Sequence, residues 1–306
     1  MDNALIGSTG FVGGHLLRQR SFAARFNSRN ISEAAGEKFD TVVCAAAPGS
    51  MFQANRFPER DQAQIDALIG RLSGISARRM VLISTIAVLA DCAGGDDETT
   101  SAFVAGLAYG RNRRTLETFC AGYFDRCLIV RLPALFGEDL KKNFLFDILN
   151  PMPSMLTEAR LSELAGRLPA ALRGGLPEIY RWDEGLALFV IDRQALAASG
   201  RRGDYDAAVT DLGLSAVGFT HPDSSFQYYD MTRLWTDIAL CLDRRLDVIH
   251  LAPEPLRAGE VFAALRGASW RRTKRGCIAK ICARVMRRCL DAAAATSRMR
   301  TRRCGS

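Results

Sequence analysis

Three glycines near the start of the chain have the spacing of a phosphate-binding loop. Gly7, Gly10 and Gly13 form the pattern G-x-x-G-x-x-G, directly after the short apolar run 4–6 and before a helix-like stretch that reaches Leu17. Glycines let the backbone turn tightly and approach a diphosphate, whose charge then lies at the positive N-terminal end of a helix. The pattern predicts a dinucleotide-binding loop, although any strand-to-helix turn can use glycine.

The segment that follows bears on which dinucleotide binds. An acidic residue after the next strand would favour the free 2′-hydroxyl of NAD. Here the sequence reads Arg25-Phe26-Asn27-Ser28-Arg29-Asn30, with no acid until Glu33. Because Arg29, supported by Ser28, suits a 2′-phosphate, we expect NADP, with NAD still possible. The alternative is that Arg29 is an ordinary solvated charge.

The elements that would position these residues alternate between strands and helices. Apolar runs typical of strands buried on both faces occur at 40–47, 80–88 and 127–132. Helical periodicity occurs between them at 58–79 and 109–119. This alternation predicts an α/β fold, a Rossmann-like doubly wound parallel sheet with a smaller C-terminal substrate region.

Four ordered motifs make the chain similar to the extended short-chain dehydrogenase/reductase family, which contains nucleotide-sugar epimerases, dehydratases and ketoreductases. They are GSTGFVG at 7–13, Ser84-Thr85 at the end of a strand, Tyr109 24 residues after Thr85, and RLPALFG at 131–137. The resemblance covers roughly residues 1–265. It implies that the dinucleotide contacts the following residues: Gly7, Thr9, Gly10, Phe11, Val12, Gly13, Ser28, Arg29, Ala45, Ala46, Tyr109, Arg113 and Pro133.

The resemblance also implies the catalytic roles. Hydride transfer at a carbinol carbon requires a proton to move on the adjacent oxygen, and a tyrosine phenol does this near neutral pH only if its pKa is lowered. Tyr109 would be the acid/base, Thr85 the hydroxyl that holds the substrate oxygen, and Ser84 a second hydroxyl. The alternative for Tyr109 is a tyrosine that merely packs on a helix.

Two departures from the family pattern narrow the chemistry. The family has Y-x-x-x-K, but Arg113 stands four residues after Tyr109; it keeps the positive charge, yet its planar fork does not replace an ammonium group. Thr85 is followed by Ile86-Ala87, where 4,6-dehydratases carry an acid and a base, so that dehydration is not expected. We therefore expect reduction of a 4-keto sugar nucleotide or 4-epimerisation. A non-catalytic dinucleotide-binding protein is the alternative.

The chain divides into three predicted parts: a dinucleotide-binding domain at 1–137, a substrate-binding region at 138–270 whose last elements return to the sheet, and a basic tail at 271–306. Lys141, Lys142 and Asn143 could face the diphosphate of a nucleotide sugar, or could be ordinary surface residues. A strand at 248–252 and a helix at 258–265 are expected to follow. A homodimer is possible.

The charge of the chain is distributed unevenly. The net charge is +8, but 271–306 holds 12 of the 41 basic residues and one of the 33 acidic ones, which gives this segment +11 and the remainder −3. The basic tail has an amphipathic pattern that could bind anionic lipid or nucleic acid. It could equally be a poorly ordered extension or the product of a reading-frame change near 267–273. Without a functional tail, no nucleic-acid or membrane partner is expected.

Cysteine and histidine usage points to a reduced compartment and to no metal site. Five cysteines, at 44, 92, 120, 127 and 241, lie among apolar neighbours without a C-x-x-C pair, as buried thiols of a cytoplasmic protein do. The first residues lack the pattern of a signal peptide. The three histidines have no metal-ligand spacing with the cysteines.

Overall fold

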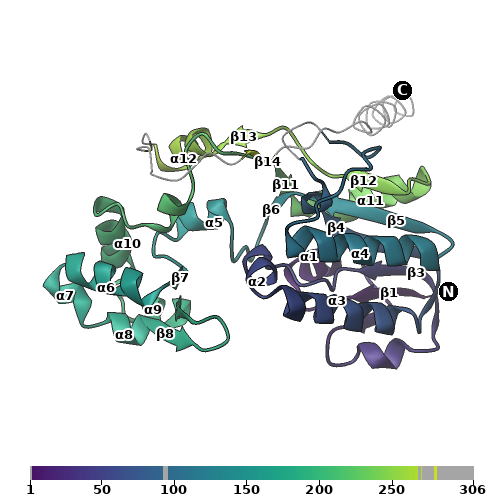
Figure 1. Ribbon diagram of the computed structural model, residues 1–306, viewed down its shortest axis with the longest axis horizontal. Coiled ribbons are helices and arrows are strands. Elements are labelled where there is room, and N and C mark those ends of the chain that lie inside the picture. The colour runs from purple at the N-terminus through teal and green to yellow at the C-terminus, as the bar shows by residue number, and fades with distance from the viewer. Residues whose placement is uncertain (1, 92–95, 268–269, 271–278, 281–306) are drawn as a thin grey trace, which may run out of the picture. The chain divides into compact units, whose positions relative to one another are not determined.

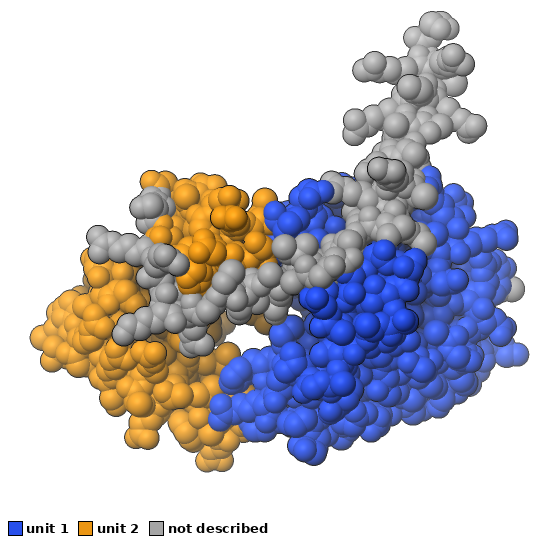
Figure 2. Space-filling view, turned by 45° about the horizontal axis from the view of Figure 1, so that its top comes forward, with its two compact units in different colours: residues 1–139, 226–255, 279–306 blue, residues 140–225, 256–278 orange. Residues whose placement is uncertain are grey.

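A computed structural model describes residues 2–91, 96–267, 270 and 279–280. The chain forms two compact units (Figure 2). Unit 1 comprises 1–139, 226–255 and 279–306, and unit 2 comprises 140–225 and 256–278. The expectations for the basic tail concern residues that, apart from 279–280, lie outside the described ones. The functional assignment of 138–270 stays a prediction.

The predicted doubly wound parallel sheet is confirmed in unit 1 (Figure 1). Its six strands run in the order β12-β5-β4-β3-β1-β2, and all neighbouring pairs are parallel. Their bounds are β1 Asn3–Ile6, β2 Ala24–Phe26, β3 Lys38–Cys44, β4 Ser76–Thr85, β5 Cys127–Leu132 and β12 Val248–His250. The chain adds β2 on one side of β1 and then β3 on the other, so that the order of the strands reverses between β1 and β3. Ligands of open α/β sheets bind beyond the carboxyl ends of the strands at such a switch point.

Helices cover both faces of this sheet because its strands alternate apolar side chains between the two faces. On one face Met80 and Leu82 of β4 pack in a core that includes Ile65 of α3 (Pro58–Leu72) and Leu116 of α4 (Ala108–Tyr123). On the other face Val81 and Ile83 pack in a second core. That core includes three residues from α1 (Phe11–Gln19) and α11 (Leu234–Asp243), namely Leu16, Leu234 and Ile238.

Several predicted boundaries were wrong, and the strands expected at 40–47 and 248–252 end at Cys44 and His250. The helical periodicity at 58–79 ends as a helix at Leu72, because Ser73-Gly74 stops the helix and β4 already begins at Ser76. The strand expected at 80–88 ends at Thr85, and 86–88 form a single 3₁₀ turn instead. The strand at 127–132 has the predicted bounds.

Unit 2 has its own core and its own small sheet. Its antiparallel sheet β7-β9-β8 was not predicted from the sequence, since its strands have only two to four residues. Its strands are β7 Met155–Leu156, β8 Tyr180–Asp183 and β9 Leu188–Ile191. Its helices are α5 Phe144–Leu149, α6 Glu158–Arg167, α7 Ala170–Arg173, α8 Leu176–Ile179, α9 Arg193–Ala198, α10 Arg202–Asp211 and α12 Ala258–Arg266.

The remaining elements are short. They are α2 Met51–Arg56, β6 Ala134–Phe136, β10 Ser225–Phe226, β11 Tyr228–Asp230, β13 Leu256–Arg257 and β14 Ala279–Lys280. β6 and β11 pair in parallel within unit 1. No helix in the described part of the chain is long and apolar enough to span a bilayer.

Four of the five predicted buried cysteines can be compared with the structure, and Cys92 lies outside the described residues. Cys44, Cys120 and Cys241 are buried and Cys127 is half-buried; all four are free thiols. Burial raises the pKa of the Cys44 thiol to about 11, so that this thiol is protonated and unreactive at neutral pH.

Candidate functional site

The glycine loop connects β1 to α1 at the carboxyl edge of the sheet. Gly7 has φ 90°, and a Cβ there would lie 2.5 Å from the carbonyl oxygen of Ala45, which directly follows β3. A Cβ at Gly13 would lie 2.1 Å from the carbonyl oxygen of Gly7. Only glycine fits these two positions, so the chain makes a tight turn after β1 that lies against the end of β3, at the switch point of the sheet.

The N-terminus of α1 is open to an anion. Gly10 precedes the helix with no side chain that caps it, and the first turn contains no acidic residue. Thr9 and Gly10 are exposed, while Phe11 and Val12 are half-buried and pack against the core. The free N–H groups and the helix dipole together fit a diphosphate at this position. The loop therefore fits the dinucleotide that the sequence predicts.

The other residues expected around the dinucleotide lie near the ends of neighbouring strands. Ala45 and Ala46 follow β3 and Pro133 follows β5; all three are half-buried. Ser28 and Arg29 follow β2 and are exposed; the backbone N–H of Arg29 donates to the side chain of Asn27 over 2.9 Å. The guanidinium group of Arg29 forms no ion pair within the described residues, which leaves its charge accessible to a ligand.

Thr85 and Tyr109 come together at the carboxyl end of β4, as their predicted roles require. The side chain of Thr85 acts on the phenol of Tyr109 as a hydrogen-bonding group and opposes the rise of its pKa. Helix α4 approaches the strand closely because residue 110 is glycine: a Cβ on Gly110 would lie 2.0 Å from the carbonyl oxygen of Ala87. The backbone N–H of Tyr109 donates to Oδ1 of Asn55 over 2.9 Å, which fixes the first turn of α4.

The environment of Tyr109 favours the protonated phenol. Burial raises the pKa of Tyr109, while the charge of Arg113 and the hydrogen bond with Thr85 act in the opposite direction and only reduce that rise. The expected net lowering of the pKa is therefore absent in the protein alone. A protonated phenol can donate a proton, which is what the reduction of a carbonyl requires.

Arg113 is held by contacts within unit 1. Its guanidinium group forms a buried ion pair with Asp61 of α3 and donates to the carbonyl oxygen of Pro48. The guanidinium carbon lies 4.2 Å from the centre of the Tyr109 ring. Arg113 is thus placed to act on Tyr109 through its charge, while both terminal nitrogens bind groups of the chain itself.

A buried ionic network surrounds Ser84, the residue before Thr85 on β4. Arg131 donates from Nε and Nη2 to the two carboxylate oxygens of Glu117 over 3.0 and 2.8 Å, and the Ser84 hydroxyl donates to the same carboxylate over 2.6 Å. Nη1 of Arg131 lies 3.2 Å from Nε2 of His250. Ser84, Arg131 and His250 lie side by side because they are register partners on β4, β5 and β12.

Sequence reasoning missed Glu117, Asp61 and Asn55. A signal existed for Glu117, which stands eight residues after Tyr109 and therefore on the same face of α4. Asp61 and Asn55 come from other helices and carry no comparable signal. The hydroxyl of Ser84, predicted as a second hydroxyl for the substrate, donates a hydrogen bond to Glu117, and its role toward a substrate stays a prediction.

The three residues predicted to face a substrate diphosphate belong to unit 2. Lys141 and Lys142 are exposed. Asn143 has φ 120° and its side chain accepts a hydrogen bond from the N–H of Phe146 over 3.2 Å, which caps α5. Asn143 thus has a structural function, and the role of all three residues toward a substrate stays a prediction. Among the described residues, no three His, Cys, Asp or Glu side chains are placed to share a metal ion.

Comparison with known proteins shows a fold that carries several chemistries. No family model and no curated protein sequence matches the chain. A dTDP-4-dehydrorhamnose reductase from Bacillus anthracis, in complex with NADP, is similar over 94% of this chain and 91% of its own, with 13% identity and a TM-score of 0.58. A UDP-galactose 4-epimerase is similar over 93% and 90%, with 14% identity and a TM-score of 0.57.

A third similar structure is a dTDP-glucose 4,6-dehydratase, a double mutant from Streptomyces venezuelae with NAD bound. It is similar over 93% of this chain and 88% of its own, with 14% identity and a TM-score of 0.57. The sheet topology and these similar structures define a doubly wound parallel α/β protein. Its fold is that of the extended short-chain dehydrogenases/reductases, as the four motifs predict. Because reductases, epimerases and dehydratases share this fold, the reaction must be argued from the site.

Proposed function

We propose that the protein is an NAD(P)-dependent oxidoreductase that acts on a nucleotide-linked sugar by hydride transfer. The observation that carries this proposal is that Thr85, the last residue of β4, and Tyr109, in the first turn of α4, come together at the same edge of the sheet as the open N-terminus of α1. The two reactions that fit are reduction of a 4-keto sugar and 4-epimerisation. Dehydration does not fit, because Ile86 and Ala87 after Thr85 have no group that moves a proton.

The chain's own residues supply proton transfer and orientation. The bound dinucleotide would supply or accept the hydride. Thr85 orients the substrate oxygen, and the protonated Tyr109 donates its proton to that oxygen as a carbonyl is reduced. Arg113, fixed over the Tyr109 ring by Asp61, stabilises the phenolate that remains. Its charge thus replaces part of the function of the missing lysine.

NADP is the proposed dinucleotide, with Arg29 and Ser28 as the residues that bind its 2′-phosphate. The support is the exposed, unpaired charge of Arg29 after β2, with no acid on that segment before Glu33. Arg29→Gln should weaken NADPH binding and leave NADH binding unchanged. Equal losses for both dinucleotides would contradict this assignment.

A glycine pair gives a matched test of dinucleotide binding. Gly10 stands at the N-terminus of α1, whereas Gly14, in the same helix, has open space where the methyl group of an alanine would lie. Gly10→Ala should weaken NADPH binding several-fold, because the methyl group occupies the space of the diphosphate. Gly14→Ala should bind normally. NADPH fluorescence titration measures both, and equal affinity in the two variants would contradict the proposed cradle.

Turnover is tested by NADPH oxidation with 4-keto sugar nucleotides, at saturating NADPH. Lys141→Gln and Lys142→Gln should raise KM for the nucleotide sugar without changing kcat if these lysines bind its diphosphate. A second candidate function, non-catalytic dinucleotide binding, is favoured by one observation: both terminal nitrogens of Arg113 bind within the chain. Saturable NADPH binding without turnover on any nucleotide sugar would support this second candidate.

A further inference from the structure

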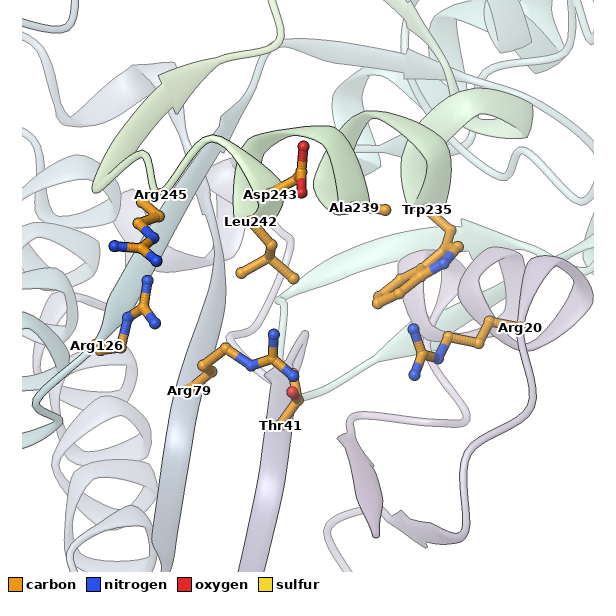
Figure 3. Close-up of a pocket in the computed structure, with 9 residues that line it drawn as sticks. All are labelled: Arg20, Thr41, Arg79, Arg126, Trp235, Ala239, Leu242, Asp243 and Arg245. Carbon is orange, nitrogen blue, oxygen red and sulfur yellow. The ribbon is translucent and has the colours of Figure 1, made fainter. Parts of the chain in front are cut away.

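A pocket of about 420 Å³ in unit 1 is lined by four arginines and lies away from Tyr109 (Figure 3). Its lining residues are Arg20, Thr41, Arg79, Arg126, Trp235, Ala239, Leu242, Asp243 and Arg245. Asp243 is the single acidic residue among these lining residues. A volume of this size accommodates a small molecule.

The pocket lies at the opposite end of the strands from the candidate active site. Arg79 is the fourth residue of β4 and Thr85 is the last, so that six residues, roughly 20 Å of extended chain, separate them. Arg126 directly precedes β5. A ligand in this pocket is therefore distinct from a dinucleotide at the glycine loop.

The strand register places the floor of the pocket on one level. Thr41 and Arg79 are register partners on β3 and β4, and the N–H of Met80 donates to the carbonyl oxygen of Arg126 over 2.8 Å. Arg79 stands two residues before Val81 on β4, so both side chains point to the sheet face covered by α1 and α11. Thr41, the register partner of Arg79 on β3, points to the same face. Polar and charged side chains thus replace the apolar core at this end of the same sheet face.

Three contacts fix the wall of the pocket that Arg20 and Trp235 form. The guanidinium carbon of Arg20 lies 4.2 Å from the ring centre of Trp235 in α11, and the backbone N–H of Trp235 donates to Oε1 of Gln19 over 2.8 Å. Gln19 in turn donates to the carbonyl oxygen of Met231 over 2.7 Å. The end of α1 and the start of α11 are therefore fixed to each other, which preorganises Arg20 and Trp235.

Arg245 occupies a position where glycine is the usual residue. It has φ 55°, and the N–H of Leu246 donates to the carbonyl oxygen of Cys241, the hydrogen bond that ends many helices after a left-handed residue. Figure 3 shows the guanidinium groups of Arg245 and Arg126 extending toward each other at one end of the pocket, with Arg20 at the other end. Two like charges that face each other favour an anion between them.

Most of this positive charge has no partner in the described residues. Arg79 forms an ion pair with Asp40, whereas Arg20, Arg126 and Arg245 form none with any described carboxylate. Guanidinium groups bind phosphate oxygens in a bidentate manner. From this geometry we propose that the pocket binds a small molecule that carries a diphosphate group, held by Arg126 and Arg245 at one end and by Arg20 at the other.

Trp235 provides a direct probe of the pocket, because the chain has only three tryptophans. In a Trp182→Phe/Trp270→Phe background, Trp235 is the only emitter, and both replaced residues belong to unit 2. Inorganic pyrophosphate is the probe ligand, added to the full chain in the presence of saturating NADP. We expect saturable quenching of Trp235 fluorescence and an increase in the melting temperature, since the ligand binds the folded state.

The decisive variant is Arg126→Gln/Arg245→Gln in that background, with Arg257→Gln, which replaces an exposed arginine of unit 2, as the surface control. The double variant should bind pyrophosphate about tenfold more weakly or worse. The control, which removes one exposed positive charge outside the pocket, should bind normally. Unchanged affinity in the double variant overturns the proposal. So does quenching that occurs only without NADP, which would place the anion at the glycine loop, or binding without saturation at millimolar pyrophosphate. The result does not depend on turnover, so failure of the proposed function leaves the test intact. If the tryptophan background does not fold, calorimetric titration of the wild-type chain and the arginine variant decides in its place.

Discussion

The arginines at the two ends of the unit 1 sheet differ in burial and in ion pairing. At the carboxyl end, Arg131 and Arg113 are buried and each forms an ion pair with a buried carboxylate, Glu117 or Asp61. At the amino end, Arg126 and Arg245 are exposed and form no ion pair with a described carboxylate. Burial is thus accompanied by pairing, and exposure by available charge.

The physical reason lies in the cost of removing a charge from water. A buried guanidinium group without a partner is strongly unfavourable, so the carboxyl end must contain its own counterions. The paired network at that end can therefore fix geometry around Thr85, but it has little charge left for a ligand. The amino end keeps its charge, because water solvates it until an anion binds.

Loss of the buried carboxylate should have the largest effect on stability. Glu117→Gln leaves Arg131 buried with an unneutralised charge and should lower the free energy of unfolding by about 3–5 kcal/mol. Urea denaturation measures this loss. Glu163→Gln is the matched control, because Glu163 forms an exposed pair with Arg160 at 2.7 Å and its loss should cost less than about 1 kcal/mol. Equal losses would contradict the distinction between the two kinds of pair.

Replacement of Arg113 by lysine should have a smaller effect. A lysine keeps the charge near Tyr109 but cannot reach both Asp61 and the carbonyl oxygen of Pro48 with a planar fork. Arg113→Lys should therefore lower the free energy of unfolding by about 1.5–3 kcal/mol. NADPH affinity should stay the same, because both terminal nitrogens of Arg113 bind within the chain. A gain in NADPH affinity would show that residue 113 contacts the dinucleotide.

The ion pair at the amino end should have a pH-dependent effect. The hydrogen bond from Arg79 is the main cause that holds the pKa of Asp40 below its ordinary value. Because the folded-state pKa is lowered, this stabilisation is present above the unfolded pKa of about 4 and is lost as the pH falls below it. Asp40→Asn should cost about 1 kcal/mol or less at pH 7, and this cost should shrink toward zero as the pH falls through the lowered folded-state pKa. A constant difference in melting temperature across this range would contradict the assignment.

Removal of an unpaired arginine should have the smallest effect. Arg126→Gln breaks no ion pair among the described residues and relieves repulsion from Arg245, so stability should change by less than about 0.5 kcal/mol or should increase. Thermal unfolding without added phosphate measures this change. A loss as large as that of Glu117→Gln would mean that Arg126 is structural and would weaken the distinction between the two ends.

The sequence was sufficient for features whose residues are local or follow a regular spacing. The turn at Gly7 and Gly13, the parallel sheet and the approach of Tyr109 to Thr85 all follow from strand-to-helix order and short motifs. The helix that ends at Leu72 was predicted too long, because apolar periodicity does not show where a helix gives way to a strand.

Features that depend on distant pairing were not predictable. The Asp61–Arg113 pair joins two helices, and no spacing in the sequence indicates it. The arginine pocket gathers residues from Arg20 to Arg245, and the net charge of −3 outside the basic tail conceals this local excess. The roles of Lys141, Lys142 and Asn143 stay predictions, because these three residues belong to unit 2, whereas the glycine loop, Thr85 and Tyr109 belong to unit 1.

Hydride transfer by the wild-type chain tests the central claim most directly. The protein is mixed with NADPH deuterated at C4 of the nicotinamide and with a 4-keto sugar nucleotide, and the product sugar is analysed by mass spectrometry. We expect one deuterium at carbon 4 of the sugar, and a rate about 10²–10⁴-fold lower in Tyr109→Phe at saturating NADPH. Bound NADPH without deuterium transfer, or an equal rate in Tyr109→Phe, would contradict the proposed function.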